Sequence, residues 1–571
     1  MIETTSDTPA TWDAVADLVV VGTGAAALTA AIVGTVEGLS VIALEKSALV
    51  GGTTSVSGGG IWVPLNHHMA DVGVPDSREE ALEYLRACAG DAGDDDLLVA
   101  LVDHGAPMVR YLEERAGLRF RAWPSQGPTL DYRPWLPGAK HGGRPLDPGR
   151  FRVADLGEWG PKVRRGGQSE WVMDRLEYYT KRMFALPPAD AAPRPYRPEA
   201  PDAVPEYFAA GSALVGQLLK ACIELGVGIE TERPARRLVV DGGRVIGVAA
   251  ERDGSPYFVR ATRAVVLGTG GYGTNEELKR LWLNRPLLNT CDIPENQGDG
   301  HLMGMAVGAQ VANLGDAWWM PMGSVEAADG TVVNIAGVRE DRILPHTLMV
   351  NQRGKRFTNE AQNYYDICEA FGLKSGGTPR NHPAHLIFDQ QAAGKYAALA
   401  RTAAAPDEPG NGLTVAGSIE ELAGKLEIDP GSLHETIERF NGFAREGRDR
   451  DFARGENPWD AAWGDPDHRP NPSLGTVEKP PFFAVRLMPA ALATKGGLRV
   501  NADGQVLSAA LPFDPIPGLY AAGNCSNAGV AGAYPGPGAT LGPAMTFGYI
   551  AARSVARGAE LAPAARAVAG A

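Results

Sequence analysis

Glycine-rich loops near the two ends of the chain carry the residue types best suited to bind a ligand through the backbone. The first loop, Gly22-Thr23-Gly24-Ala25-Ala26-Ala27, has the spacing G-x-G-x-x-A. The second, Tyr534-Pro535-Gly536-Pro537-Gly538-Ala539-Thr540-Leu541-Gly542-Pro543, precedes a helix expected to begin near Ala544. Glycine lets backbone N–H groups approach a ligand closely, and helix starts carry unpaired donors and positive potential. Both loops could hold an electron-rich ligand, although either could be an ordinary connection.

The elements around the first loop support a dinucleotide site. Residues 17–21 (DLVVV) form an apolar, β-branched run typical of a buried parallel strand, and an alanine-rich helix is expected up to Gly38. Residues 41–44 predict the next strand, which ends at an acidic residue. Strand, glycine turn, helix, strand and acid together form the dinucleotide-binding pattern. The residues that we assign to this site are Gly22, Gly24, Ala25, Ala26 and Glu45.

A further N-terminal loop distinguishes between FAD and NAD as the dinucleotide. Residues 51–60 (GGTTSVSGGG) offer many backbone donors and hydroxyl groups. A flavin has a pyrophosphate, a ribityl chain and a ring to hold, whereas NAD needs no such loop, so we favour FAD. A flexible linker is the alternative, but apolar residues 61–64 follow at once. The residues assigned here are Lys46, Gly52, Thr53, Ser57, Gly58 and Gly59.

Three later segments are expected to complete the cofactor site. Residues 264–273 predict a buried strand with a G-x-G-x-x-G turn; no acidic strand follows, so it should pack on the first nucleotide. Asp299 precedes a helix, and its side chain could either cap that helix or contact the cofactor. Residues 519–524 predict a strand that ends in a small-residue turn before the second glycine-rich loop. The residues assigned here are Thr269, Gly270, Asp299, Gly523, Asn524, Gly538, Thr540 and Leu541.

The composition limits the class of protein. The chain has 571 residues and a net charge of −14, so two or three domains and no nucleic-acid partner are expected. The five scattered cysteines form no C-x-x-C pair and the histidines show no metal-binding spacing, so neither a disulfide framework nor a metal site is predicted. His67-His68 and His382/His385 are interpreted as loop residues. Because there is no signal-peptide pattern and no long apolar run, a cytoplasmic protein is expected.

The alternation of predicted strands and helices along the chain predicts an α/β fold. A Rossmann-like FAD-binding domain is expected from residues 1–295 and 485–571, with an α+β substrate domain, 296–484, inserted into it. Residues 160–205 are predicted as an insertion, because basic and aromatic residues interleave there before a Pro/Ala-rich run. This insertion is either a solvated helix with a linker or a segment that contacts a membrane surface or a partner subunit. Residues 118–152 are rich in proline, glycine and aromatics and could line a pocket for a flat apolar ligand.

Six motifs carry a resemblance to a known family over nearly the whole chain. They are DLVVVGTGAAALTAA, LEKSALVGGTTSVSGGGIWVP, NQRGKRFTNEAQNYYD, ATKGGLRV, GLYAAGN and AYPGPGATLGPAMTFGYIAA. Together they resemble the fumarate reductase/succinate dehydrogenase-type flavoproteins, and within them the 3-oxosteroid Δ1-dehydrogenases. The resemblance implies a Rossmann-like FAD-binding fold with an inserted catalytic domain.

The resemblance also implies a reaction and the residues that perform it. A C1–C2 double bond enters a 3-oxosteroid when a base removes the C2 proton and hydride leaves C1 for flavin N5. By similarity, the Tyr534 hydroxyl and the Gly538 N–H polarise the ketone, Tyr364 is the base, and Tyr132 relays the proton. The adjacent Tyr365 is an alternative base. An external electron acceptor, of quinone type or another kind, is implied as a partner.

Other functions remain open at this point. In fumarate reductases the last motif supplies an arginine that binds the substrate. Here no arginine occurs between Tyr534 and Arg553, which disfavours a dicarboxylate substrate. The alternatives are a 3-oxosteroid Δ4-(5α)-dehydrogenase, a fumarate-reductase-type ene-reductase, and a flavin-containing electron-transfer subunit. Side-chain preference at steroid C17 and oligomeric state are not specified by the sequence.

Overall fold

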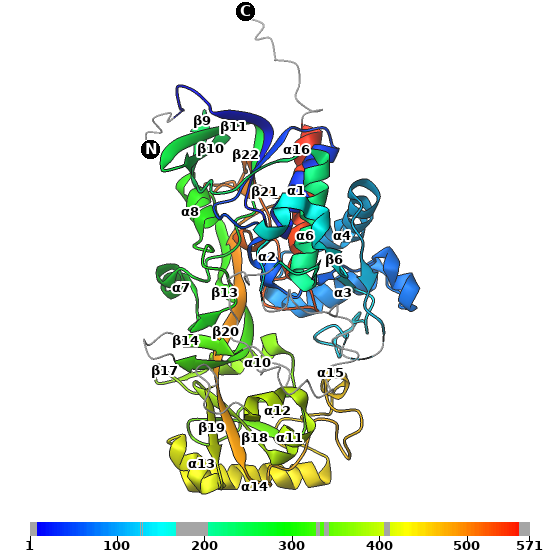
Figure 1. The fold of residues 1–571 in the computed structure, drawn as a ribbon, viewed down its shortest axis with the longest axis vertical. Helices are drawn as coiled ribbons and strands as arrows, with labels where there is room; N and C mark the ends of the chain where they lie inside the picture. The colour runs from blue at the N-terminus through cyan, green and yellow to red at the C-terminus, as the bar shows by residue number, and fades with distance from the viewer. Residues whose placement is uncertain are drawn as a thin grey trace, which may run out of the picture.

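The molecule is elongated, with both chain-terminal regions at one end and residues 412–446 at the other (Figure 1). The computed structural model describes residues 8–125, 127, 129–166, 204–326, 332–335, 342–404 and 412–558. Two long antiparallel strands, β13 (Val311–Glu326) and β20 (Phe482–Leu498), run side by side between the two ends. Most of the predicted insertion, residues 167–203, lies outside the described residues.

An eight-stranded sheet forms the core of the first region. Its central strands are parallel and lie in the order β22 (Pro515–Ala521), β11 (Ser255–Leu267), β1 (Ala14–Val21), β2 (Val41–Leu44) and β8 (Gly228–Glu230). The outer strands are β21 (Gln505–Leu507) and the hairpin of β9 (Ala235–Asp241) and β10 (Arg244–Arg252). Residues 18–21 are buried because helices or loops cover both faces of this parallel core. The sheet therefore brings the last strand of the chain close to the first.

Helices from distant parts of the chain surround this sheet; the first and the last of them contact its strands, and the others pack on these two helices or on one another. They are α1 (Ala25–Val36), α2 (Gly52–Val56), α3 (Arg78–Ala89), α4 (Asp95–Ala116), α6 (Ala210–Leu225) and α16 (Leu541–Gly558). Helix α16 begins at Leu541, so the expected start near Ala544 was wrong by three residues. The reason is local: the Gly538 carbonyl accepts hydrogen bonds from the Leu541 and Gly542 N–H groups and starts the first turn on the loop.

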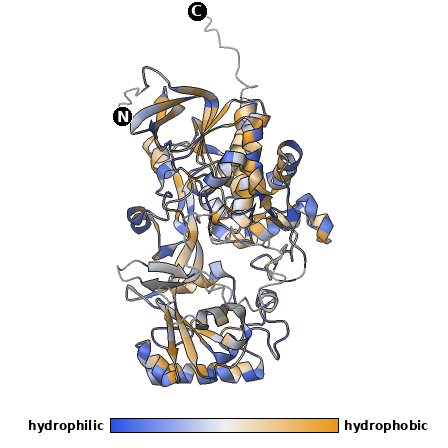
Figure 2. Cartoon of the chain, viewed as in Figure 1, coloured by the Kyte–Doolittle hydropathy of each residue, from blue (hydrophilic) through white to orange (hydrophobic). Residues whose placement is uncertain are grey.

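A seven-stranded sheet and the remaining helices form the other region. Its strands are β14 (Val332–Ile335), β13, β20, β18 (Ala384–Asp389), β15 (Thr347–Asn351), β12 (Asn289–Thr290) and β19 (Leu413–Ala416). The helices described between β13 and β20 are α10 (Tyr364–Phe371), α11 (Gln390–Lys395), α12 (Ala397–Ala404), α13 (Ile419–Lys425), α14 (Pro430–Glu446) and α15 (Pro458–Trp463). Figure 2 shows apolar strands beside helices with polar outer faces. Residues such as Leu348, Ile387 and Phe440 form the buried core between them.

Short elements connect these parts. They are β3 (Ile61–Trp62), β4 (Arg121–Ala122), β5 (Pro145–Asp147), β6 (Phe151–Arg152), β7 (Tyr207–Phe208), β16 (Lys374–Ser375), β17 (Thr378–Pro379), α7 (Glu276–Trp282) and α8 (Asp299–Ala306), with 3₁₀ turns η1 (His67–Val72), η2 (Gly90–Ala92), η3 (Val153–Lys162) and η5 (Gly523–Cys525). The expectation that His67, His68 and His385 lie in loops was wrong, because the first two lie in η1 and the third in β18. Among the described helices, none combines the length and apolar character that crossing a bilayer requires.

Candidate active site

Three tyrosines from distant segments meet in one cluster. The Tyr132 hydroxyl donates a 2.7 Å hydrogen bond to the Tyr364 hydroxyl. The Tyr534 ring stacks on the Tyr132 ring at 5.0 Å between centroids and meets the Tyr364 ring edge-on at 5.5 Å. Tyr132 lies in the loop between β4 and β5, Tyr364 opens α10, and Tyr534 precedes α16. The structure thus brings together all three tyrosines that the sequence predicted.

The two adjacent tyrosines of α10 point into different surroundings. The Tyr365 hydroxyl donates to the Asp316 carboxylate at 2.7 Å and not to the other tyrosines. Asn363 caps the helix by accepting from the Tyr365 and Asp366 N–H groups. Because consecutive helical residues are about 100° apart around the axis, fixing the helix start fixes which tyrosine faces Tyr132. That residue is Tyr364.

Hydrogen bonds from three directions fix the loop that carries Tyr534. The Pro535 carbonyl accepts from the Tyr84 hydroxyl at 2.6 Å and from the Tyr132 N–H at 2.9 Å. The Lys495 ammonium donates to the Ala533 carbonyl at 2.6 Å. Because these bonds hold the residues on either side of Tyr534, its ring has a defined position.

Two further polar groups of this loop are the Tyr534 hydroxyl and the Gly538 N–H. The Thr540 hydroxyl donates to the Tyr534 oxygen at 3.1 Å. Among the described residues, no carbonyl or side chain accepts from the Gly538 N–H. Gly538 has a φ of +92°, and a Cβ there would lie 2.6 Å from Gly60 backbone atoms, so only glycine fits.

Burial sets the protonation of the cluster. Removal from water, together with the neighbouring Tyr132 and Tyr534, holds the pKa of Tyr364 well above its ordinary value. Burial likewise lowers the pKa of Lys495 to about 8, although the Asp316 carboxylate, 3.4 Å from its ammonium, opposes this shift. Tyr364 is therefore a neutral phenol in the neutral pH range.

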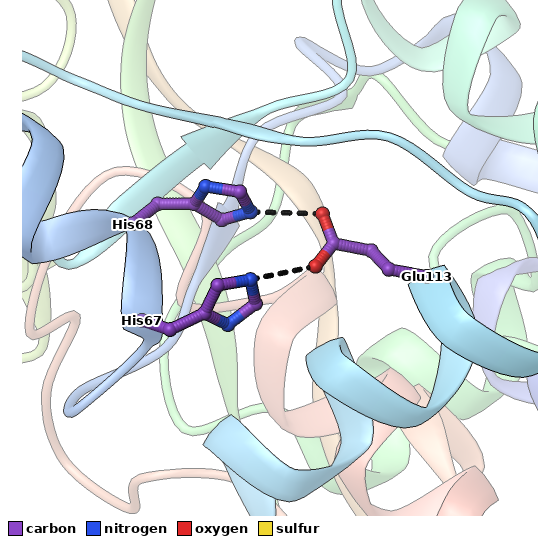
Figure 3. Close-up of side chains that lie close together, drawn as sticks. All are labelled: His67, His68 and Glu113. Atoms are coloured by element: carbon purple, nitrogen blue, oxygen red, sulfur yellow. Dashed lines mark hydrogen bonds and ion pairs between the residues drawn. The ribbon is translucent and has the colours of Figure 1, made fainter.

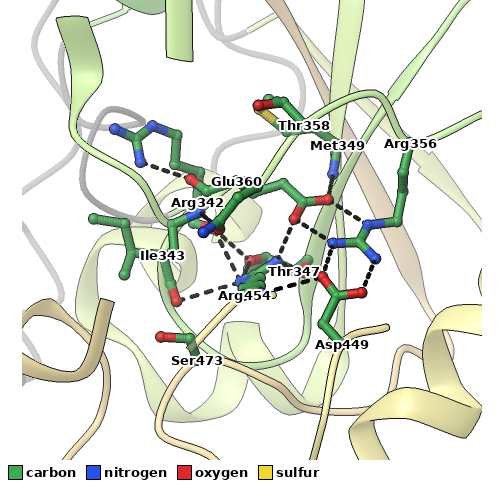
Figure 4. Close-up of polar contacts among 12 residues, drawn as sticks. Arg342, Ile343, Thr347, Met349, Arg356, Thr358, Glu360, Asp449, Arg454 and Ser473 are labelled. Atoms are coloured by element: carbon green, nitrogen blue, oxygen red, sulfur yellow. Dashed lines mark hydrogen bonds and ion pairs between the residues drawn. The ribbon is translucent and has the colours of Figure 1, made fainter. Parts of the chain in front are cut away.

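A buried ion cluster supports the segment that leads to Tyr364. Figure 4 shows the Glu360 carboxylate between two guanidinium groups, at 2.7 Å from Arg356 and 3.3 Å from Arg454. Arg356 also binds Asp449 at 2.7 Å, and Arg342 donates to the Glu360 carbonyl at 2.7 Å. Both guanidiniums lower the pKa of Glu360, which burial alone would raise. The cluster joins the Tyr364 segment to the loop after α14.

The two N-terminal glycine-rich loops, residues 22–27 and 51–60, meet at the start of α1. Gly22 has a φ of +106°, and a Cβ there would lie 2.5 Å from the Gly268 carbonyl, so the turn requires glycine. By contrast, a Cβ at Gly52 would find no atom closer than Gly24, at 3.8 Å. Gly24 and Gly52 thus lie close together at the start of α1, where the Thr54 hydroxyl accepts from the Ala25 N–H at 3.0 Å. This meeting point of the two loops is called the cofactor cradle, because the other first-turn N–H groups of a helix can bind a pyrophosphate.

The other predicted cofactor residues lie around this cradle. Lys46 and Asp299 form an ion pair of 2.5 Å, and the Thr23 hydroxyl donates to Glu45 at 2.5 Å. Asn524 accepts from Trp318 at 3.0 Å, and a Cβ at Gly523 would lie 3.2 Å from Ala26. A cleft next to these residues is lined by Lys495, Gly496, Gly523, Asn524 and Thr540. The remaining predicted cofactor residues come shortly after α2 or β11 in the chain, or at the end of the Tyr534 loop: Ser57, Gly58, Gly59, Thr269, Gly270 and Leu541.

Four residues of this region were not predicted from the sequence: Asp292, Asp316, Trp318 and Lys495. Thr53 donates to Asp292 at 2.5 Å, and burial raises the pKa of Asp292 to about 6. Trp318 lies edge-on to Tyr534 at 4.9 Å. Lys495 falls within a motif that the sequence analysis quoted, so a signal for it existed. Asp292, Asp316 and Trp318 fall in no motif, and only the fold places them here.

Comparisons with known proteins give a matching family and several relatives. A family model described as "FAD binding domain" matches residues 17–541. The 4-oxocyclohexanecarboxylate 2-dehydrogenase of Sinomonas cyclohexanicum is 39% identical over 95% of this chain and 92% of that protein. The 3-oxosteroid 1-dehydrogenase of Mycolicibacterium smegmatis is 34% identical over 95% of this chain and 97% of that protein.

Solved structures show the same relationship. The 3-ketosteroid Δ1-dehydrogenase of Sterolibacterium denitrificans, in complex with 1,4-androstadiene-3,17-dione, superposes with a TM-score of 0.83 at 32% identity, over 95% of this chain and all of that one (100%). A flavocytochrome c3 fumarate reductase in its open conformation, 22% identical, shares the fold with a TM-score of 0.62 over 96% of this chain and 79% of that one.

Proposed function

The chain belongs to the FAD binding domain family, and from that premise we propose that it introduces a C1–C2 double bond into 3-oxosteroids. It is an FAD-dependent oxidoreductase whose relatives are dehydrogenases of CH–CH groups. The observation that carries the proposal is the meeting of three tyrosine hydroxyls beside the Tyr534–Gly538 loop. This cluster supplies both hydrogen-bond donors for a ketone and an acceptor for a proton.

The roles of the chain's own residues follow from their donors and acceptors. The Tyr534 hydroxyl, whose oxygen already accepts from Thr540, and the Gly538 N–H hold the C3 ketone oxygen and stabilise the charge that develops there. The deprotonated form of Tyr364 then removes the C2 proton, and Tyr132, hydrogen-bonded to it, passes a proton onward. Bound FAD supplies the acceptor for the hydride that leaves C1.

We assign the cofactor to the cradle between the two N-terminal glycine loops and the Tyr534 loop. Gly22 makes the turn after β1, Gly24 lies at the start of α1, and Glu45 follows the end of β2, where it would accept from ribose hydroxyls. Gly523, Asn524, Thr540 and Leu541 would border the ring. This assignment is supported by the order of strand β1, glycine turn, helix α1, strand β2 and acidic residue.

The charges near the tyrosines favour a neutral substrate. Lys495 already faces Asp316 at 3.4 Å, and Arg133 forms an ion pair with Asp366 at 2.8 Å. A substrate carboxylate would have to compete with these aspartates for its cation. A steroid ketone has no such requirement.

A second candidate substrate is 4-oxocyclohexanecarboxylate, because the 39% identical relative is named for it. The chemistry is the same, since in both compounds the new double bond lies α,β to a ring ketone. Only the carboxylate and the size of the ring system differ. The two candidates therefore share the tyrosine roles and differ in what surrounds them.

One experiment separates the candidates. Androst-4-ene-3,17-dione or 4-oxocyclohexanecarboxylate is added anaerobically to the purified holoenzyme, and flavin absorbance at about 450 nm is followed. We expect bleaching with the steroid and, with an artificial acceptor, formation of the 1,4-diene. Bleaching by the small acid alone would replace the steroid with the second candidate. If neither compound bleaches the flavin, the proposed reaction is wrong.

Two alternatives from the sequence are tested in the same assay. A Δ4-(5α)-dehydrogenase would convert a saturated 5α-3-oxosteroid to the 4-ene, whereas we expect the 1-ene. A fumarate-reductase-type enzyme would oxidise a reduced dye with fumarate, and we expect no such activity, because the Tyr534 loop has no arginine.

The partners need separate tests. We propose an external electron acceptor, quinone-type or other, and the acceptor that reoxidises the steroid-reduced protein fastest identifies its class. Contact of residues 160–205 with a membrane surface stays a hypothesis that rests on their basic and aromatic composition. If deletion of residues 167–200 leaves binding to anionic liposomes and oligomeric state unchanged, that hypothesis is wrong.

A further inference from the structure

Two histidines and a glutamate converge away from the tyrosine cluster. His67 and His68 open η1, and Glu113 lies near the end of α4 (Figure 3). The His67 Nε2 atom lies 2.9 Å from one Glu113 oxygen, and the His68 Nε2 atom lies 2.8 Å from the other. One ligand atom from each of the three residues lies within 4.8 Å of the ligand atoms of the other two. No other such group of ligand atoms occurs among the described residues.

The convergence of the two rings is unusual for neighbours in a chain. Consecutive residues of a helical turn point in different directions and rarely face a common partner. Here the ring centroids of His67 and His68 lie 4.1 Å apart with an interplanar angle of 36°, and both Nε2 atoms point at the same carboxylate. The arrangement presents two nitrogens and a carboxylate to one point.

Both ring nitrogens of His68 face carboxylates, an arrangement that stabilises positive charge there, either a second proton on the imidazole or a bound metal ion. Its Nδ1 atom lies 3.2 Å from the Asp71 carboxylate, and its Nε2 atom lies 2.8 Å from Glu113. A neutral imidazole has only one N–H, so it cannot donate to both carboxylates. If Nδ1 donates to Asp71, the Nε2 lone pair faces Glu113 and is free to bind a metal ion. A carboxylate that orients a metal-binding histidine in this way is common in zinc proteins.

We propose that His67, His68 and Glu113 form a binding site for a divalent transition-metal ion of the Zn²⁺ type. Imidazole nitrogens suit Zn²⁺, Ni²⁺ or Co²⁺, whereas Mg²⁺ and Ca²⁺ prefer oxygen ligands alone. Zn²⁺ bonds nitrogen and oxygen at about 2.0–2.2 Å, so small rotations of the two rings would place all three atoms around one ion. The side chains of His67, His68 and Glu113 are 30%, 17% and 14% exposed, so water can complete the coordination.

The ion would join two segments that are far apart in the sequence. Helix α4 packs against α16, and η1 follows β3, whose Trp62 N–H donates to the Gly538 carbonyl at 3.0 Å. A metal bridge would therefore tie the segment after β3 to α4. Binding to the folded state alone raises thermal stability.

The test uses tag-free holoenzyme that has been treated with a chelator and dialysed. After equilibrium dialysis against ZnCl₂ and removal of free metal, we expect about one Zn²⁺ per chain and a higher Tm. Glu113→Gln and His68→Asn should abolish retention, and Asp71→Asn should weaken the affinity by about 10–100-fold. His434→Ala is the control, because His434 is exposed and lies beside Glu420 in the other region.

Each outcome decides the proposal. Retention by the wild-type chain and by His434→Ala, with loss in Glu113→Gln, supports it. If the wild-type chain retains no Zn²⁺, or if Glu113→Gln retains as much, the proposal is overturned. Flavin absorbance verifies that each variant is folded, and the exposed Asp71 can be changed without disturbing the core.

Discussion

Tyr364 and Tyr365 provide the sharpest test at the scale of single residues. The Tyr364 hydroxyl accepts from Tyr132, whereas the Tyr365 hydroxyl donates to Asp316. Since a general base typically contributes about 10²–10⁴-fold, we expect Tyr364→Phe to lower the rate of anaerobic flavin reduction by that factor. The matched Tyr365→Phe variant should lose less than about tenfold. A larger loss in Tyr365→Phe would reverse the assignment, provided that both variants retain flavin.

The protonation of Tyr364 predicts how the rate depends on pH. Burial and its two tyrosine neighbours hold its pKa well above the ordinary value, so only a small fraction is ionised near pH 7. A base acts in its deprotonated form, and that fraction grows about tenfold per pH unit below the pKa. We therefore expect kcat/KM to rise steadily from pH 7 to about pH 9. A flat profile over this range would contradict Tyr364 as the base.

The sequence could predict the three tyrosines but not the choice between Tyr364 and Tyr365. The motif placed both in the site, and the direction of each ring depends on where α10 begins, which Asn363 fixes by capping. Asp316 and Lys495 lie 179 residues apart in sequence and meet only because β13 pairs with β20. No local pattern encodes such a pairing.

At the scale of elements, the ion cluster around Glu360 holds the Tyr364 segment to the loop after α14. The two guanidiniums depress the folded-state pKa of Glu360 below 4.5, its unfolded reference, so its contribution to stability is present above that pH. The contribution is lost as pH falls further, through the folded-state pKa. We expect Glu360→Gln to cost about 3–5 kcal/mol at pH 7 and progressively less below about pH 4.5.

Urea unfolding at several pH values measures this difference. The control is Glu435→Gln, because Glu435 forms an exposed pair with Lys355 and should contribute little at any pH. A destabilisation by Glu360→Gln that stays constant from pH 7 to about pH 3 would contradict the electrostatic explanation. Flavin reduction should also slow, because the segment that carries Tyr364 loses its anchor.

For the molecule as a whole, the fold class and the FAD cofactor were predicted correctly because their signals are local. The β1–α1–β2 unit with its glycine turn spans about thirty consecutive residues and follows a known physical pattern. The contacts of α16 with α1 could not be predicted from the sequence, because they join residues more than 500 positions apart. The same limit applies to Glu113, which no histidine spacing could connect to His67 and His68.

The meeting of the two chain ends yields the last prediction. Gly548 of α16 lies against α1 so closely that a Cβ would be 2.4 Å from the Ala26 carbonyl, next to the cofactor cradle. Although alanine favours helices, we expect Gly548→Ala to lower unfolding stability by about 1–3 kcal/mol and to reduce bound flavin. Gly558→Ala is the control, since no atom lies within 4 Å of its Cβ position on the same helix. The ratio of absorbance at about 450 nm to that at about 280 nm and the Tm measure both effects. Equal flavin content and Tm in the two variants would show that α16 does not brace the N-terminal end of α1.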